Sequence, residues 1–204
     1  MTEDAITQYP QARILLFARA PRIGKVKTRL IPALGEQGAL DIHLRLLKRQ
    51  MDVLAETRLC PSQLWIDQDS QDPVVDDFNG EVYLQQGDDL GQRMFYAANK
   101  VLDQASAVII IGSDCPELDQ AYLGQALSYL SDPATDVVIG PALDGGYVLI
   151  GMKKAEWHIF NDIDWGSEKV LEQTRDSLKR LNLSSQFLAP LCDIDTEEDL
   201  ARLL

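Results

Sequence analysis

Short apolar runs alternate with amphipathic segments from one end of the chain to the other. Two runs, residues 14–18 and Ala107–Gly112, are continuously apolar, which is typical of central parallel strands that are covered on both faces. Further β-type runs predict strands at residues 62–67, 81–86, 136–141, 147–152 and 187–194. The sequence therefore predicts a sheet of several strands with two apolar faces.

Segments with helical spacing separate most of these strands. Leu40, Leu44, Leu47, Met51 and Leu54 place one apolar face on a predicted helix at residues 36–57. Other helices are predicted from the segment at 87–94 to about residue 104, at 119–131, from Trp165 onward, and through Leu204 with Asp195 as N-cap. The alternation predicts an α/β fold, a Rossmann-like, three-layer, open and mostly parallel sheet with helices on both faces.

The length and composition suit one domain. The chain has 204 residues, of which 46% are hydrophobic, enough for a substantial core. We expect a disordered leader at residues 1–12 and a single domain at residues 13–204. No run of about 18 apolar residues predicts a membrane span. The first residues lack the features of a secretory signal, so we expect a cytoplasmic protein.

Positive charge is concentrated in one part of an acidic chain. The net charge is −13, with 32 acidic and 19 basic residues, yet residues 5–35 contain six Lys or Arg and no Asp or Glu. Such an island favours a small polyanion bound at one place, whereas a nucleic acid needs a broad basic face. The alternative is a solvated loop whose charges only aid solubility.

The basic island follows the first predicted strand. Loops of this kind, between a buried strand and a helix, bind phosphates in α/β proteins through backbone N–H groups and basic side chains. The loop has neither a Walker A sequence nor a GxGxxG sequence, which argues against a P-loop ATPase and a dinucleotide-dependent dehydrogenase.

Two carboxylates follow predicted strands at the same edge of the sheet. Asp114 follows the run 107–112 after one Ser, and Asp195 comes after the last predicted strand. Facing a phosphate loop, such carboxylates fit a Mg²⁺ or Mn²⁺ site, in which water and substrate phosphates complete the shell. Each could instead only cap a helix. Two histidines and three widely spaced cysteines offer little support for other metal or disulfide chemistry, and Cys115 is better interpreted as a buried residue than as a nucleophile.

Six segments, in their order and spacing, resemble the glycosyltransferase A-like (GT-A) family of nucleotide-diphospho-sugar transferase fold, known as radical-SAM/selenodomain-associated transferases. They are FARAPRIGKVKTRL, GDDLGQRM, IGSDCP, DGGYVLIG, IDWGS and DIDTEEDL. The pattern is remotely similar to the molybdenum-cofactor nucleotidyltransferases and the phospholactate guanylyltransferases. The resemblance covers residues 13–204.

The resemblance implies a role for each matching residue. The phosphates of the nucleotide would contact Arg19, Gly24, Lys25, Lys27, Thr28 and Arg29, and the base or ribose would lie near Gly91, Gln92 and Arg93. Asp114 would bind the metal, with Asp195 as second carboxylate, and Asp114, Lys27 and Asp144 are the catalytic candidates. The sugar or acceptor would face Asp144, Gly145, Gly146, Tyr147, Trp165, Gly166 and Ser167.

Three functions remain open at this point. The resemblance implies a metal-dependent transferase that takes a sugar nucleotide and a small-molecule acceptor. The segment Ser113-Asp114-Cys115-Pro116 has one Asp instead of an Asp-x-Asp motif, which leaves nucleotidyl transfer from a nucleoside triphosphate as an alternative. A non-catalytic nucleotide-binding protein is the third possibility, since a fold does not fix a function. Asp144-Gly145 is also a strong hairpin-turn signal.

Overall fold

The computed structural model of the protein describes residues 7–203, which form one seven-stranded sheet in the order β3-β2-β1-β4-β6-β5-β7. Strand β6 is antiparallel to β4 and to β5, and the other strand pairs are parallel. This mostly parallel sheet confirms the predicted fold class. The strands are β1 Ala12–Ala18, β2 Ser62–Ile66, β3 Glu81–Leu84, β4 Ala107–Gly112, β5 Val137–Pro141, β6 Tyr147–Met152 and β7 Ser185–Phe187.

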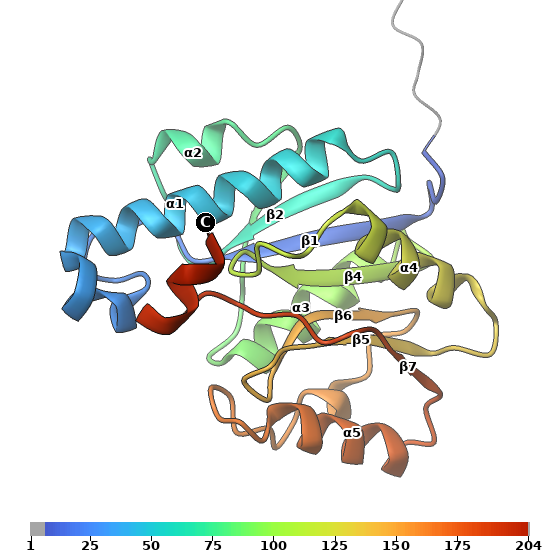
Figure 1. Cartoon of the computed structure of the whole chain (residues 1–204). Coiled ribbons are helices and arrows are strands. Elements are labelled where there is room, and N and C mark those ends of the chain that lie inside the picture. The colour runs from blue at the N-terminus through green and yellow to red at the C-terminus, as the bar shows by residue number, and fades with distance from the viewer. Residues whose placement is uncertain (1–6, 204) are drawn as a thin grey trace, which may run out of the picture.

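Helices cover both faces of the sheet (Figure 1). Residues of α1 (Ile31–Glu56), α2 (Pro73–Asp76) and α4 (Gln120–Ser131) pack in one hydrophobic cluster. Residues of α3 (Leu90–Leu102) and α5 (Val170–Arg180) pack in the other. Three 3₁₀ segments complete the described elements: η1 Thr28–Leu30, η2 Trp157–Ile159 and η3 Glu197–Leu203.

The two central strands explain this layering. Ile14 and Leu16 of β1 belong to the cluster under α1, whereas Leu15, between them, belongs to the cluster under α3. Because side chains alternate across a strand, a continuous apolar run supplies both faces at once. The continuous runs at 14–18 and 107–112 therefore lie in the middle of the sheet, as predicted.

The C-terminal elements differ from the prediction. The predicted strand 187–194 is wrong: β7 ends at Phe187, and Pro190, which lacks a backbone N–H, cannot continue a ladder. The predicted helix from Trp165 begins only at Val170. Asp195 is not the cap of the terminal helix, since the Asp199 carboxylate accepts the backbone N–H groups of Asp195 and Thr196.

The described part of the N-terminal leader, from residue 7, is hydrogen-bonded to the rest of the protein. Residues 1–6 of the expected disordered leader lie outside the described residues. The backbone N–H groups of Gln8 and Tyr9 donate to the carbonyl oxygens of Arg58 and Leu59. Residues 8 and 9 are therefore anchored to the turn between α1 and β2.

Candidate active site

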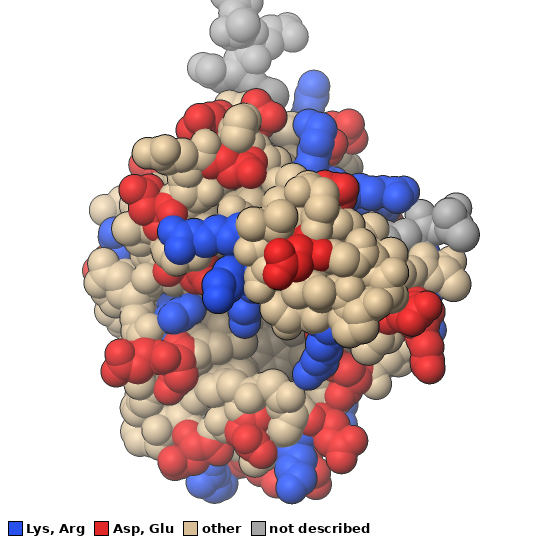
Figure 2. Space-filling model, turned by 90° about the vertical axis from the view of Figure 1, so that its left-hand side faces the viewer, with Lys and Arg blue, Asp and Glu red and all other residues tan. Residues whose placement is uncertain are grey.

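A cleft of about 610 Å³ opens at the carboxyl ends of β1, β2, β3 and β4. Figure 2 shows this end of the molecule, with Lys and Arg side chains gathered around a hollow and Asp and Glu side chains around them. Open α/β sheets bind ligands at this edge. The cleft is lined by Phe17, Ala18, Arg19, Val26, Lys27, Thr28, Arg29, His43, Asp67, Gln85, Asp88, Asp89, Leu90, Arg93, Gly112, Ser113, Asp114 and Asp195.

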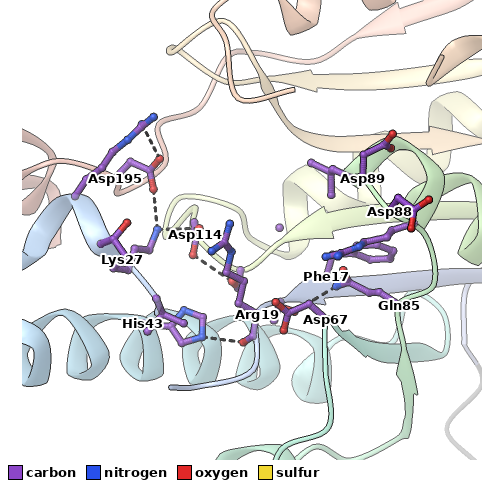
Figure 3. A pocket seen from close by; sticks show the side chains of 18 residues that line it. Phe17, Arg19, Lys27, His43, Asp67, Gln85, Asp88, Asp89, Asp114 and Asp195 are labelled. Carbon is purple, nitrogen blue, oxygen red and sulfur yellow. Dashed lines mark hydrogen bonds and ion pairs between the residues drawn. The ribbon is translucent and has the colours of Figure 1, made fainter. Parts of the chain in front are cut away.

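Lys27 joins the two predicted carboxylates at one end of the cleft (Figure 3). Its Nζ lies 2.8 Å from Asp114 Oδ2 and 3.0 Å from Asp195 Oδ1, and it donates to the Ile194 carbonyl oxygen at 2.6 Å. Burial alone would lower the pKa of Lys27, but Asp114 and Asp195 outweigh that effect, and the net pKa is raised. The ammonium group is therefore charged at neutral pH.

The chain brings these residues together from three distant segments. The loop after β4 is tied to α1, because Gln50 Nε2 donates to the Cys115 carbonyl oxygen at 2.6 Å. The Ile194 N–H donates to the Asp114 carbonyl oxygen at 2.9 Å, which places Asp195 beside that loop. Lys27 reaches both carboxylates from the basic loop, where it adopts the left-handed region with φ 46°. In Figure 1 the basic loop and η3 lie at the same end of the sheet.

His43, from α1, is hydrogen-bonded to the start of the basic loop. Its Nε2 lies 3.0 Å from the Arg19 carbonyl oxygen, and since a carbonyl only accepts, Nε2 carries the proton. Burial lowers the pKa of His43, so the ring is neutral at neutral pH. His43 therefore positions Arg19 rather than contributing charge to the cleft.

The basic loop divides into residues that line the cleft and residues that do not. Arg19, Lys27, Thr28 and Arg29 line it, as predicted. Lys25 is exposed and lies outside the lining. Gly24 has φ 70°, and a Cβ added there would lie 3.0 Å from Glu36 Oε1, so this glycine serves the turn of the loop.

The segment 87–93 contributes different residues from those expected. Arg93 lines the cleft. Gln92 instead takes part in the N-terminal cap of α3, where its N–H and its side-chain amide donate to the Asp89 carboxylate. Gly91 is buried, and a Cβ there would lie 2.7 Å from the Phe160 carbonyl oxygen and 2.8 Å from Trp165 Nε1. Gly91 and Gln92 thus shape the N-terminus of α3 rather than line the cleft.

The residues expected to face the acceptor lie outside the lining of the cleft. They form the hairpin between β5 and β6 and the loop before α5, which pack together: Leu171 N–H donates to the Gly145 carbonyl oxygen at 2.9 Å. The Asp144 carboxylate accepts the Gly146 N–H, as in a hairpin turn. Tyr147 and Trp165 contact edge to face at 6.3 Å, and burial raises the pKa of the Tyr147 hydroxyl. Ser167 accepts the Lys169 N–H, and Gly166 has φ 87°.

The carboxyl group of Asp193 has a pKa that neighbouring carboxylates change. Burial, and then the charges of Asp144 and Asp195, raise the pKa of Asp193 to about 6. Asp193 therefore lies within electrostatic range of both Asp144 and Asp195. Within the described residues, no group of three or more His, Cys, Asp or Glu side chains is arranged to hold a metal ion by itself.

The sequence reasoning missed the lining residues that follow β2 and β3. Asp67 follows β2, and Gln85 and Asp88 follow β3. The rule that located Asp114, a polar residue directly after a strand, applies to Asp67 and Gln85 as well. His43 carries no such signal, because it lies in the middle of a long helix.

A family comparison matches residues 50–167, more than half of the chain, to a family described as an uncharacterized protein conserved in bacteria (DUF2064). The chain belongs to the DUF2064 family. A comparison with curated proteins finds no match to the sequence.

Solved structures share the fold of this DUF2064 protein. A protein from Desulfovibrio desulfuricans G20, named provisionally as a nucleotide-diphospho-sugar transferase, is 32% identical with a TM-score of 0.87, over 95% of this chain and 86% of that one. The 4-diphosphocytidyl-2C-methyl-D-erythritol synthase of Anaerococcus prevotii DSM 20548 is 11% identical with a TM-score of 0.63, over 95% and 96%. Rv0371c of Mycobacterium tuberculosis H37Rv, in complex with manganese, is 17% identical with a TM-score of 0.59, over 95% and 98%.

These likenesses confirm the nucleotide-diphospho-sugar transferase fold that the sequence motifs implied. At the lower identities they show the fold alone. Between residues 7 and 203, no helix of the protein is both long enough and apolar enough to cross a membrane.

Proposed function

We propose that this protein is a metal-dependent transferase that uses a nucleotide-activated donor, a sugar nucleotide, and a small-molecule acceptor. The observation that carries the proposal is the cluster of Lys27, Asp114 and Asp195 in a 610 Å³ cleft at the carboxyl ends of the strands. The named function of the Desulfovibrio relative supports the sugar nucleotide as donor.

The donor atoms in the cleft fit Mg²⁺ or Mn²⁺. Asp114 Oδ2 and Asp195 Oδ1 already converge on one cation, the Lys27 ammonium, and their side chains remain 40% and 38% exposed. Small divalent ions prefer one or two carboxylates and take the other ligands from water and phosphate oxygens. Asp114 and Asp195 would hold the ion, which would neutralise negative charge on the donor phosphates.

The basic side chains of the cleft would bind the diphosphate of the donor. Arg19, Lys27 and Arg29 line the cleft, and Lys27 and Arg29 pair with the two carboxylates. Positive charges that are already in place stabilise a departing phosphate without reorganisation of the protein. Binding the donor and the acceptor side by side also makes their reaction effectively unimolecular. Asp144, on the β5–β6 hairpin, would orient the acceptor from the edge of the site.

The lone Asp of the Ser113-Asp114-Cys115-Pro116 segment favours a second candidate, nucleotidyl transfer. Glycosyl transfer releases a nucleoside diphosphate from a sugar nucleotide, whereas nucleotidyl transfer releases pyrophosphate from a nucleoside triphosphate. Product analysis after incubation with each donor class distinguishes the two reactions. A non-catalytic protein would bind nucleotide and release neither product.

The test of the proposal compares Asp114→Asn with the wild-type protein. We expect metal-dependent turnover of the donor to fall about 100-fold or more, as expected when a group that stabilises developing charge is lost. The protein should remain folded, because the Asn amide oxygen can still accept a hydrogen bond from Lys27. Asp69→Asn is the matched control, since Asp69 is exposed and lies outside the lining of the cleft. Equal turnover by Asp114→Asn and wild type would contradict the proposal.

A further inference from the structure

The cleft has a second end, opposite the Lys27 cluster. Figure 3 shows Asp67, Gln85, Asp88 and Phe17 on one side and Lys27 and Asp195 on the other. If phosphates bind at the Lys27 end, as the proposed function requires, the nucleoside extends toward the second end. The hydrogen-bonding groups there then determine which base the protein accepts.

The amide of Gln85 has a fixed orientation. Its Nε2 donates to the Trp65 carbonyl oxygen at 2.8 Å and to the Ala18 carbonyl oxygen at 3.2 Å. Both partners are backbone carbonyls, which only accept, so the nitrogen must face them and the oxygen must point elsewhere. Among the described residues, Gln85 Oε1 has no hydrogen-bond partner. Gln85 therefore offers the cleft an acceptor.

Asp67 offers a second acceptor. Its Oδ1 accepts the Ala20 N–H at 2.8 Å, which fixes the carboxylate at the end of β2. Its Oδ2 has no partner among residues 7–203. One oxygen of Asp67 is thus structural, and the other is available to a ligand.

The loop before α3 adds a third acceptor and one donor group. The Asp88 N–H donates to Gln92 Oε1, while the Asp88 carboxylate lines the cleft and has no hydrogen-bond partner within the described chain. Arg93 Nε donates to the Gly87 carbonyl oxygen at 3.0 Å, which leaves its terminal N–H groups for the cleft. Phe17 and Leu90, which is 44% exposed, supply apolar lining for the faces of a ring.

This inventory, three acceptors and one Arg, selects among the four common bases. The Watson–Crick edge of guanine donates from two adjacent groups, N1–H and the N2 amine, and guanine O6 and N7 accept from Arg. Adenine and cytosine donate from one amine each, and uracil donates only from N3–H between two acceptor oxygens. We propose that the second end of the cleft binds guanine, with Gln85, Asp67 and Asp88 as acceptors and Arg93 as donor.

The test measures calorimetric binding of GDP, ADP, CDP and UDP to the full chain with Mn²⁺ present. We expect GDP to bind at least about tenfold more tightly than the other three, the discrimination typical of one good set of base contacts. In Asp67→Asn, the amide oxygen can keep the Ala20 N–H, and the amide nitrogen replaces Oδ2 as a donor. The preference for GDP over UDP should therefore narrow by about tenfold or more.

Asp69→Asn, an exposed position two residues away, is the control and should keep the wild-type preference. Preference for another base would overturn the guanine assignment and leave the proposed nucleotide-dependent function intact. An equal loss of affinity for all four nucleotides in Asp67→Asn would show a structural role for Asp67 and overturn its role in selection. Failure of all four to bind the wild-type protein would overturn the proposed function itself.

Discussion

Lys27 is the residue on which the chemistry of the cleft centres. Its side chain is 3% exposed and its Nζ contacts three oxygens, from Asp114, Asp195 and the Ile194 carbonyl. A buried ammonium that is held by two carboxylates stays charged, because loss of the proton would leave both carboxylates uncompensated. A divalent ion at the same carboxylates would therefore compete with Lys27 until donor phosphates supply a second partner for the ammonium.

Replacement of Lys27 by Met tests this competition. We expect Lys27→Met to bind Mn²⁺ in the absence of nucleotide about tenfold more tightly than wild type, since a positive charge about 3 Å from both carboxylates is removed. Titration calorimetry or the spectrum of free Mn²⁺ measures this affinity without any turnover. Lys25→Met, which removes an exposed charge from the same loop, should change it little; equal effects of the two variants would contradict the account.

The three cysteines provide a separate test at this scale. Burial raises the pKa of the thiols of Cys60 and Cys115 to about 12, and it also raises the pKa of Cys192. At pH 8 we expect none of the three to react readily with a thiol reagent in the folded protein, and all three to react after denaturation, because the thiolate is the reactive form. Rapid modification of Cys115 in the folded protein would instead support Cys115 as a nucleophile, contrary to the interpretation from the sequence.

Single residues could be predicted where a local pattern marks them. Asp114 follows a continuous apolar run, and Lys27 lies in the one basic, Gly-containing loop, so both were found from the sequence. The ion pair between Lys27 and Asp195 joins residues 168 positions apart, and no local pattern indicates such a pairing. The free acceptors of Asp67 and Gln85 depend on contacts with backbone groups of distant segments, so they could be found only from the structure.

At the scale of elements, the β5–β6 hairpin and the loop before α5 depend on close backbone contact. A Cβ at Gly145 would lie 2.1 Å from the Glu168 carbonyl oxygen, and Gly145 has φ 92°. Gly166, in the other loop, has a similar φ of 87°, but a Cβ there would meet nothing within 4 Å. A substitution at either glycine would therefore strain the backbone. Only at Gly145 would the new side chain also clash with neighbouring atoms.

Alanine at each position separates these two effects. We expect Gly166→Ala to cost about 1 kcal/mol of unfolding free energy, from the left-handed backbone alone. Gly145→Ala should cost about 3 kcal/mol or more, since a backbone oxygen must also move. Denaturant unfolding of both variants measures the difference. Equal costs would show that the hairpin and the loop do not pack as closely as the structure has them.

Elements were predicted best where the chain is buried on both sides. The run at 107–112 gave β4 with correct bounds, and the β-type run at 147–152 gave β6. The end of the chain was predicted less well, because apolar residues near Pro190 suggested a strand that the missing N–H interrupts. Asp195 was expected at a helix cap, but its pairing with Lys27 and Arg29, from the other end of the chain, takes its side chain instead.

At the scale of the whole molecule, the cleft of this acidic protein is lined by four basic residues and five Asp residues. The net charge is −13, while Arg19, Lys27, Arg29 and Arg93 all line the cleft. Acidic surroundings repel long polyanions, whereas the loop at residues 19–29, which has five Lys or Arg and no Asp or Glu, attracts a compact anion at one place. The distribution of charge therefore agrees with a small phosphorylated ligand.

Ionic strength tests this balance of charges. We expect the affinity for a nucleoside diphosphate to fall several-fold between about 50 and 300 mM salt, because exposed charges are screened over a shorter distance at higher salt. The matching nucleoside, which has no phosphate, should bind with an affinity that changes little. Calorimetric titration at the two salt concentrations provides both values, and a salt-independent diphosphate affinity would place the phosphates outside the basic loop.

The most direct measurement is the calorimetric titration of GDP into wild-type protein and Asp114→Asn, each with and without Mn²⁺. We predict that Mn²⁺ strengthens binding to the wild-type protein and has no such effect in Asp114→Asn, which retains the metal-free affinity that the basic loop provides. Metal-enhanced binding that persists in Asp114→Asn would contradict the assignment of Asp114, and the absence of nucleotide binding to the wild-type protein would contradict the function proposed for the cleft.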